Sequence, residues 1–237
     1  MNILQNDLIW DSVWKNRKAI SDYEKKYYSF LLNFRKKLPK TSKILEAGCG
    51  TGRTLNVFKN NLTIGLDISN TAIKIAKGNA DHVILASIFN LPFKHKTFNL
   101  VYNSGVIEHF KYPNNIIAIK EMERVTKSYV IIIVPNILCL WYFMFKSIYE
   151  KIRKKWKFGY EESYTIFKLN KFISKKTSLN IEKMFGLQVF PHSNDGERNY
   201  YPKKISSAFD YIERILPYKE IYAFSVGIVC KKAKGGS

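Results

Sequence analysis

The chain has 237 residues, an ordinary apolar fraction of 46% and a formal net charge of +20. This length suits one domain with a large hydrophobic core. The three cysteines, Cys49, Cys139 and Cys230, lie far apart, which argues against a disulfide framework or a cysteine metal site. The first residues lack a basic stretch followed by an apolar run, so no secretory signal is expected and a cytoplasmic protein is favoured.

The positive charge favours anionic partners, such as nucleic acid, acidic lipid or a phosphorylated substrate. The chain is also rich in Lys, Ile and Asn, and such a biased composition gives a positive charge without any partner. Both interpretations stay open at this stage. His82, His95 and His192 show no ligand spacing, so no metal site is expected.

Residues 8–38 are predicted to be helical, because aromatic and aliphatic residues recur at helical spacing and Pro39 ends the segment. The first part holds an aromatic-rich cluster that includes Trp10 and Trp14. Most of these side chains are expected to pack on an edge of a sheet.

A glycine-rich turn follows. The short apolar run of Ile44 and Leu45 is followed by an acid, Glu46, and glycines then stand at every second position from Gly48 to Gly52. Glycine lets backbone N–H groups approach a ligand closely, because no Cβ stands in the way. Dinucleotide-binding turns have a different glycine spacing and an apolar residue in place of the acid. A carboxylate here repels a pyrophosphate and suits a ligand that carries an ammonium group.

A second carboxylate follows the next apolar strand, where residues 62–68 place Asp67 near the strand end. In a strand–helix–strand unit this position lies beside the first turn, where a carboxylate can accept both hydroxyls of a ribose.

The chain continues as alternating strands and helices, which predicts a parallel sheet with right-handed crossovers. The predicted strands are 43–48, 62–67, 82–86, 99–104, 129–134, 187–190 and 221–231. The predicted helices are 52–59, 70–78, 114–127 and 205–215. The helix over 114–127 is amphipathic, with Ile116, Ile119, Met122 and Val125 on one face.

These motifs together resemble the class I S-adenosylmethionine-dependent methyltransferases, of the type 11 kind that act on small substrates. The resemblance is carried by the glycine turn and Asp67, and by the stretches 90–93, 98–101, 104–110 and 130–136. It covers residues 42–136 well and the last third loosely. It implies S-adenosyl-L-methionine as cofactor and an α/β fold. That fold is a Rossmann-like, doubly wound, seven-stranded sheet with helices on both faces and its last strand antiparallel.

The resemblance also implies roles for single residues. Glu46 faces the ammonium group of the cofactor, Asp67 takes the ribose hydroxyls, and His109 is the candidate base or a residue that only shapes the pocket. Similar enzymes usually have Asp where Ser87 stands, so its contact with the adenine amino group is the least secure. The other implied cofactor residues are Gly48, Cys49 and Gly50 at the methionine part, Ile68, Ser87 and Ile88 around the adenine, and Asn103 and Ser104 near the methyl group.

Residues 137–176 depart from the regular alternation. The segment starts with residues that are apolar on every side. Aromatic and aliphatic residues then recur at helical spacing as one stripe, and basic residues cover the rest of the helix surface. The stripe consists of Trp141, Phe145, Ile148, Ile152 and Trp156, and the basic residues are Lys146, Lys151, Arg153, Lys154, Lys155 and Lys157. Three interpretations stay open for 141–157: a helix at an anionic membrane surface, a cap over an apolar pocket, or a core helix with a solvated face.

One methyltransferase domain is therefore expected over 1–237. Its expected parts are an N-terminal helical lid (1–41, the lid being implied by the resemblance), a cofactor-binding core (42–136), cap or insert helices (137–186) and C-terminal strands (187–237).

Methyltransferases that modify exocyclic amines of nucleic-acid bases often carry Asn-Pro-Pro-aromatic after the fourth strand. This chain has Asn-Ser-Gly-Val at 103–106 instead, which argues against that chemistry.

A small-molecule acceptor, or a lipid-like or quinone-like acceptor at a membrane, is thus favoured, and nucleic acid is less favoured. An RNA methyltransferase recruited by the basic surface and a cofactor-binding module without catalysis are the alternatives.

Overall fold

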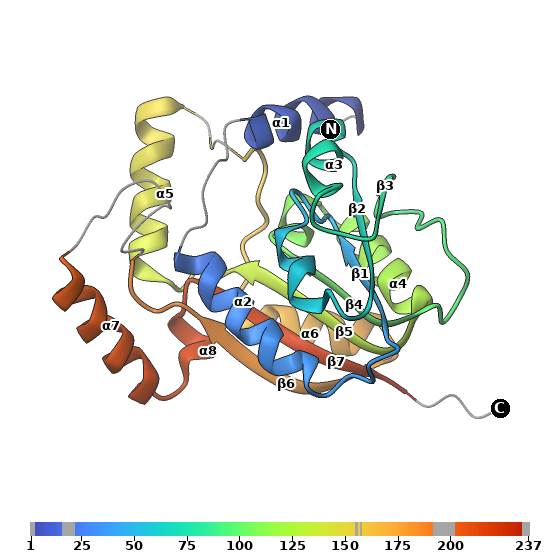
Figure 1. Cartoon of the computed structure of the whole chain (residues 1–237). Helices are drawn as coiled ribbons and strands as arrows, with labels where there is room; N and C mark the ends of the chain where they lie inside the picture. Colours follow the sequence, from blue (N-terminus) through green and yellow to red (C-terminus); the bar gives the residue numbers. More distant parts are fainter. Residues whose placement is uncertain (1–2, 16–21, 155, 157, 192–201, 234–237) are drawn as a thin grey trace.

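The computed structural model describes residues 3–15, 22–154, 156, 158–191 and 202–233 (Figure 1). In this part of the chain seven strands form one mixed sheet in the order β3-β2-β1-β4-β5-β7-β6. The first five strands are parallel, and β7 is antiparallel to both of its neighbours. The strands are β1 (Lys43–Ala47), β2 (Leu62–Asp67), β3 (His82–Leu85), β4 (Phe98–Ser104), β5 (Thr126–Pro135), β6 (Leu179–Leu187) and β7 (Ser225–Lys232).

Helices cover both faces of the sheet, and each face has its own hydrophobic core. One face packs against α2 (Asp22–Arg35), the short 3₁₀ helix η1 (Arg53–Phe58) and α3 (Asn70–Ala76). The other packs against α4 (Asn114–Val125) and α6 (Ile166–Lys176). The helical spacing of apolar residues explains this packing, since the whole predicted apolar face of α4 is buried.

The remaining helices lie around one end of the sheet and its flank. In Figure 1, α1 crosses the top of the view, and α5 and α7 stand at the left. They are α1 (Ile3–Lys15), the 3₁₀ helix η2 (Ile107–His109), α5 (Leu140–Arg153), α7 (Lys203–Ile215) and α8 (Lys219–Tyr222). Among the described residues, no helix is both long and apolar enough to cross a membrane.

The predicted fold is confirmed, and the predicted bounds were wrong near the C-terminus. The sixth strand is β6 at Leu179–Leu187, not 187–190, and 221–222 end the short helix α8 before β7 begins. β6 lies at the edge of the sheet, where polar and charged residues alternate with buried ones and weaken the apolar signal. The expected insert over 137–186 does not form one unit. Its second part belongs to the main layers, because α6 packs in the sheet core and β6 pairs with β7.

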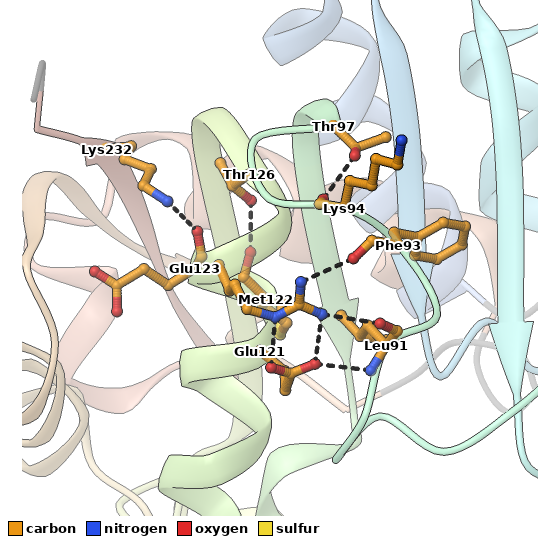
Figure 2. A network of polar contacts seen from close by, with 10 residues as sticks. Leu91, Phe93, Lys94, Thr97, Glu121, Met122, Glu123, Thr126 and Lys232 are labelled. Carbon is orange, nitrogen blue, oxygen red and sulfur yellow. Dashed lines mark hydrogen bonds and ion pairs between the residues drawn. The ribbon is translucent and has the colours of Figure 1, made fainter. Parts of the chain in front are cut away.

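A polar network on α4 fixes the loop that follows β3 (Figure 2). The Arg124 guanidinium donates to the backbone oxygens of Leu91 and Phe93, each at 2.8 Å. Arg124 also pairs with Glu121 at 2.7 Å, and Glu121 accepts the N–H of Leu91 at 2.8 Å. Paired donors of this kind hold a loop in one geometry. The network therefore fixes the 91–93 loop, which lies three residues after Ile88.

Candidate active site

A large cavity lies at the carboxyl ends of β1 and β4, with a volume of about 830 Å³. The strand order reverses between these two strands, and ligands of doubly wound sheets bind at such switch points. The volume is in the usual range for a cavity that holds a small-molecule ligand. Its lining falls into a polar half around the glycine turn and an aromatic half under α1 and α5.

The glycine turn is tightly enclosed by its neighbours. Gly48 has a φ of +80°, and a Cβ there would lie 2.6 Å from Cγ2 of Val106. Gly50 has a φ of +51°, and a Cβ there would lie 2.4 Å from the ring of Trp14 on α1. Both positions therefore require glycine, first for the backbone conformation and second for the close approach. The first helix sits directly on the turn.

Glu46 is the penultimate residue of β1, beneath this turn, and is almost fully buried. Its carboxylate accepts from the hydroxyl of Thr54 at 2.6 Å and from that of Tyr102 at 3.2 Å. No basic side chain in the described residues forms an ion pair with it. Burial raises the pKa of Glu46 to about 8, and the nearby Asp67 adds to the rise, while the two hydroxyls oppose it. Such a carboxyl is suited to a cationic ligand group.

Asp67 ends β2 beside the turn, as the sequence predicted. Its Oδ2 accepts the N–H of Gly50 at 2.7 Å, and its Oδ1 accepts the N–H of Ser69 at 2.9 Å. Burial raises its pKa, and these backbone bonds oppose the rise. The bonds orient the carboxylate toward the cavity, and each oxygen keeps a lone pair for a hydroxyl group.

The other predicted cofactor residues lie around the same half of the cavity, with one exception. Gly48, Cys49, Gly50, Ile68, Ser87 and Ile88 all line it. Ser87 is partly engaged already, since its hydroxyl accepts the N–H of Phe89 at 3.3 Å.

The exception is Asn103, and its predicted position was wrong. Its amide donates to the sulfur of Met122 at 3.2 Å, so the side chain points into the core beneath α4. Side chains of a strand alternate between the two faces of the sheet. Both faces of β4 are buried, so the sequence alone does not show which residues point to which face. Ser104, which was predicted beside Asn103, lines the cavity.

His109 lies on η2 and lines the aromatic half of the cavity. Its Nδ1 lies 2.9 Å from the backbone oxygen of Tyr160. A carbonyl only accepts, so Nδ1 carries the proton and Nε2 keeps its lone pair. Burial lowers the pKa of His109, which keeps the ring neutral near neutral pH. The ring also meets Trp10 edge-on, at 4.7 Å between centroids.

Aromatic side chains from two distant segments form the rest of the wall. Trp10 and Trp14 come from α1, and Trp141, Tyr142 and Phe145 from α5. Trp156 and Phe158 come from the segment after α5, with ring centroids 5.6 Å apart. Phe158 and Glu161 were not predicted in the lining, because they follow no motif and are brought in by tertiary packing. Glu108 belongs to the 104–110 stretch, but no role was predicted for it. Only the cap interpretation of 141–157 pointed to this wall.

The two helices of the N-terminal segment have different surroundings. Tyr27, Leu31 and Phe34 of α2 are buried in the sheet core. The tryptophans of α1 instead line the cavity, and the lid itself stays a prediction.

The predicted stripe of α5 divides between two sides. Trp141 and Phe145 line the cavity, whereas Ile148 and Ile152 are exposed, at 56% and 70%. Trp156 lies beyond the end of the helix and is buried. The predicted basic face is also divided. Lys146 pairs with Glu161 at 2.7 Å, whereas Lys151, Arg153 and Lys154 are exposed. Lys155 and Lys157 lie outside the described residues.

Comparison with known proteins identifies the fold family. Residues 45–134 match the family model described as a methyltransferase domain. A protein of Methanocaldococcus jannaschii with no described function is 33% identical over 162 residues, which cover 68% of this chain and 72% of that protein. The chain belongs to the class I S-adenosylmethionine-dependent methyltransferases. The enzyme class and the cofactor predicted from the sequence are those of this family.

Two further matches show how far the likeness of this methyltransferase extends. A Bos taurus protein named "Probable tRNA methyltransferase 9B" is 35% identical over 123 residues, which are 52% of this chain and 27% of that protein. The chain thus matches only about a quarter of the length of the first curated relatives. A chain from the Haloferax volcanii complex of the Trm112 methyltransferase activator with a methyltransferase has a TM-score of 0.65, at 11% identity and full coverage of both chains. The latter match shows the fold alone.

Proposed function

We propose that this methyltransferase transfers a methyl group from S-adenosylmethionine to an acceptor held in the aromatic half of the cavity. One observation carries the proposal: a single cavity joins Glu46 and Asp67 with the aromatic residues of α1 and α5. The cofactor supplies a methyl group that its sulfonium already activates. The protein's task is then to align the acceptor and exclude water.

The polar half of the cavity fits the cofactor. Glu46 is a buried carboxyl without a basic partner in the described residues, so it suits the ammonium group. Asp67 offers its remaining lone pairs to the ribose hydroxyls. Gly48, Cys49 and Gly50 would border the methionine part, and Ile68, Ser87 and Ile88 would border the adenine.

His109 is proposed as the base that receives a proton from the acceptor. Its Nδ1–H is held by the oxygen of Tyr160, so the free lone pair is on Nε2. Burial keeps the ring neutral, which is the state that a base requires. Trp10 packs against the ring and limits its movement.

The aromatic wall supports a small-molecule or membrane-associated acceptor with an apolar or aromatic body. Trp10, Trp141 and Trp156 place large apolar areas in the cavity wall and exclude water from the reacting groups.

Attachment to an anionic membrane surface is the second part of the proposal. The outer side of α5 exposes Leu140, Met144, Ile148 and Ile152, at 71%, 52%, 56% and 70%. Its C-terminal end carries Lys151, Arg153 and Lys154, all exposed. Apolar side chains beside cations suit an acidic bilayer, where each cation contributes about 1 kcal/mol. Co-sedimentation with anionic and neutral liposomes across a salt series tests this part, and absence of binding at low salt would contradict it.

RNA is the second candidate acceptor. The net charge of +20 and relatives named as tRNA methyltransferases favour it. RNA binding would weaken steeply with salt and would not depend on the apolar residues of α5. A labelled methyl donor offered with total RNA, with a lipid extract and with a metabolite mixture separates these acceptors.

Asp67→Ala tests the cofactor part. Loss of a charged acceptor costs about 1.5–3 kcal/mol per bond, so the affinity for S-adenosylmethionine should fall roughly 10- to 100-fold. Asp210→Ala, an exposed acid on α7, is the control and should bind like the unmutated protein. Calorimetry that finds equal binding by Asp67→Ala would reject the assignment.

A further inference from the structure

We infer that the acceptor carries a cationic amine and that Glu108 receives this amine inside the aromatic half of the cavity. The inference rests on the proposed function and deepens it by naming the chemical class of the acceptor.

Glu108 is a buried carboxyl of the cavity with an oxygen that lacks a hydrogen-bond partner among the described residues. It lines the cavity from η2, and 2% of its side chain is exposed. Its Oε2 has no hydrogen-bond partner among the described residues. Its Oε1 lies 3.9 Å from Nε2 of His109, beyond hydrogen-bonding distance. Buried polar atoms in native proteins nearly always have partners, so a missing one indicates a ligand.

The neighbouring charges do not supply that partner. The Nζ of Lys146 is 2.7 Å from Oε2 of Glu161, and Glu161 also accepts from the hydroxyl of Tyr142 at 2.8 Å. These two charges therefore compensate each other. His109 is neutral because burial lowers its pKa. Burial also raises the pKa of Glu108 well above its usual range, so it keeps a proton until a cation comes close.

The aromatic rings that line the same cavity as Glu108 suit a cation as well. Trp10 lies 6.3 Å from Phe158, and Phe145 lies 6.2 Å from Trp156, measured between ring centroids. The faces of such rings attract cations, most strongly when water is excluded. Lys146 already shows this geometry in the same wall, with its Nζ 5.5 Å from the centroid of Trp156.

Other ligand classes fit the cavity less well. A carboxylate or a phosphate would find only one guanidinium in the described lining, that of Arg53, and would give the Glu108 carboxyl no countercharge. A neutral apolar ligand would bury Glu108 further without giving its Oε2 a partner. A primary or secondary amine on an apolar or aromatic body satisfies both the carboxyl and the rings.

The test compares amines with matched neutral and anionic analogues. Tryptamine, 2-phenylethylamine and octylamine are each titrated calorimetrically into the full chain saturated with S-adenosylhomocysteine, beside the corresponding alcohols and carboxylates. We expect at least one amine to bind roughly tenfold or more tightly than its alcohol. Its binding should release a proton from Glu108, so the measured heat should change with the ionisation enthalpy of the buffer.

Glu108→Gln keeps the shape of the side chain and removes its charge, so it should lose both the preference for the amine and the proton release. Glu182→Gln, a substitution of a partly exposed acid on β6, is the control and should retain both. The inference is overturned if no amine binds better than its alcohol, or if Glu108→Gln keeps the preference. Normal binding of S-adenosylhomocysteine alongside such a result would leave the proposed function standing, whereas loss of that binding in the unmutated protein would contradict the proposed function itself. The comparison of amine with alcohol on the unmutated protein needs no variant, so it decides the matter even if Glu108→Gln does not fold.

Discussion

Oδ1 of Asp11 on α1 lies 3.0 Å from the backbone nitrogen of Thr71, and it also accepts from the hydroxyl of Ser69. Ser69 is the N-cap of α3 and accepts the N–H of Ala72. The first helix is therefore attached to the helix that follows β2, next to Asp67. This attachment holds the tryptophans of α1 over the glycine turn and closes the cavity on that side.

Asp11→Ala should loosen this closure. Two hydrogen bonds at about 1 kcal/mol each are lost, so S-adenosylhomocysteine should dissociate roughly 5- to 30-fold faster with a small change in thermal stability. Stopped-flow tryptophan fluorescence measures the release rate, and Asp210→Ala serves as the control. An unchanged release rate would mean that α1 does not limit the exchange of cofactor.

The affinity for S-adenosylmethionine should rise with pH below about 8. The pKa of Glu46 is raised to about 8, so at lower pH the ammonium group must displace a proton. Between about pH 6 and pH 7.5 the affinity should rise by up to roughly tenfold per unit. Glu46→Gln should bind more weakly and lose this dependence. Calorimetry over this range checks the slope, and a slope retained in Glu46→Gln would assign it to another group.

The same raised pKa has a consequence for folding. Between the pKa of an unfolded glutamate and about 8, the folded protein binds the proton of Glu46 and the unfolded chain does not. The contribution of Glu46 to stability is therefore complete at low pH and is lost as the pH rises through about 8. Chemical denaturation of Glu46→Gln should show less loss of stability over this interval than the unmutated protein.

His109→Ala should reduce turnover by about 10²–10⁴ and leave the affinity for S-adenosylmethionine nearly unchanged, because a base acts on the acceptor. Burial lowers the pKa of His109, so the acid limb of the pH–rate profile should lie below the usual range of histidine. His95→Ala, a change of an exposed histidine, is the control. Turnover close to that of the unmutated protein would show that His109 lines the pocket and is not the base.

Arg124→Lys should destabilise the protein although it keeps the charge. A lysine cannot reach Glu121 and the carbonyl groups of Leu91 and Phe93 together, so about 1–2 kcal/mol should be lost. Thermal unfolding should occur roughly 2–8 °C lower, whereas Arg153→Lys, on the exposed end of α5, should change little. Equal melting temperatures would show that the network adds no net stability.

The sequence predicted the parallel half of the fold well because each of its strands is a nearly continuous apolar run. Glu46 and Asp67 could be placed for the same reason, since each lies at the carboxyl end of such a strand beside the glycine turn. The edge strand β6 was misplaced because Glu182 and Lys183 interrupt its apolar residues. These signals are local, and they weaken where a strand faces solvent.

The aromatic half of the site was beyond the reach of local signals. Trp10 and Phe158 are distant in the chain, and the stacking of their rings results from tertiary packing. The face of the sheet to which Asn103 points could not be predicted, because β4 is buried on both faces. The missing partner of Glu108 is visible only once every neighbouring atom is placed.

The carboxyl-rich cavity is enclosed in a chain whose net charge is +20. A small cation therefore approaches through a repulsive outer field before it meets the attractive interior. Dissolved salt screens the outer field over about 8–10 Å and reaches the enclosed carboxyl groups much less. Added salt should then speed the entry of a cationic acceptor, whereas it slows the association of any polyanion.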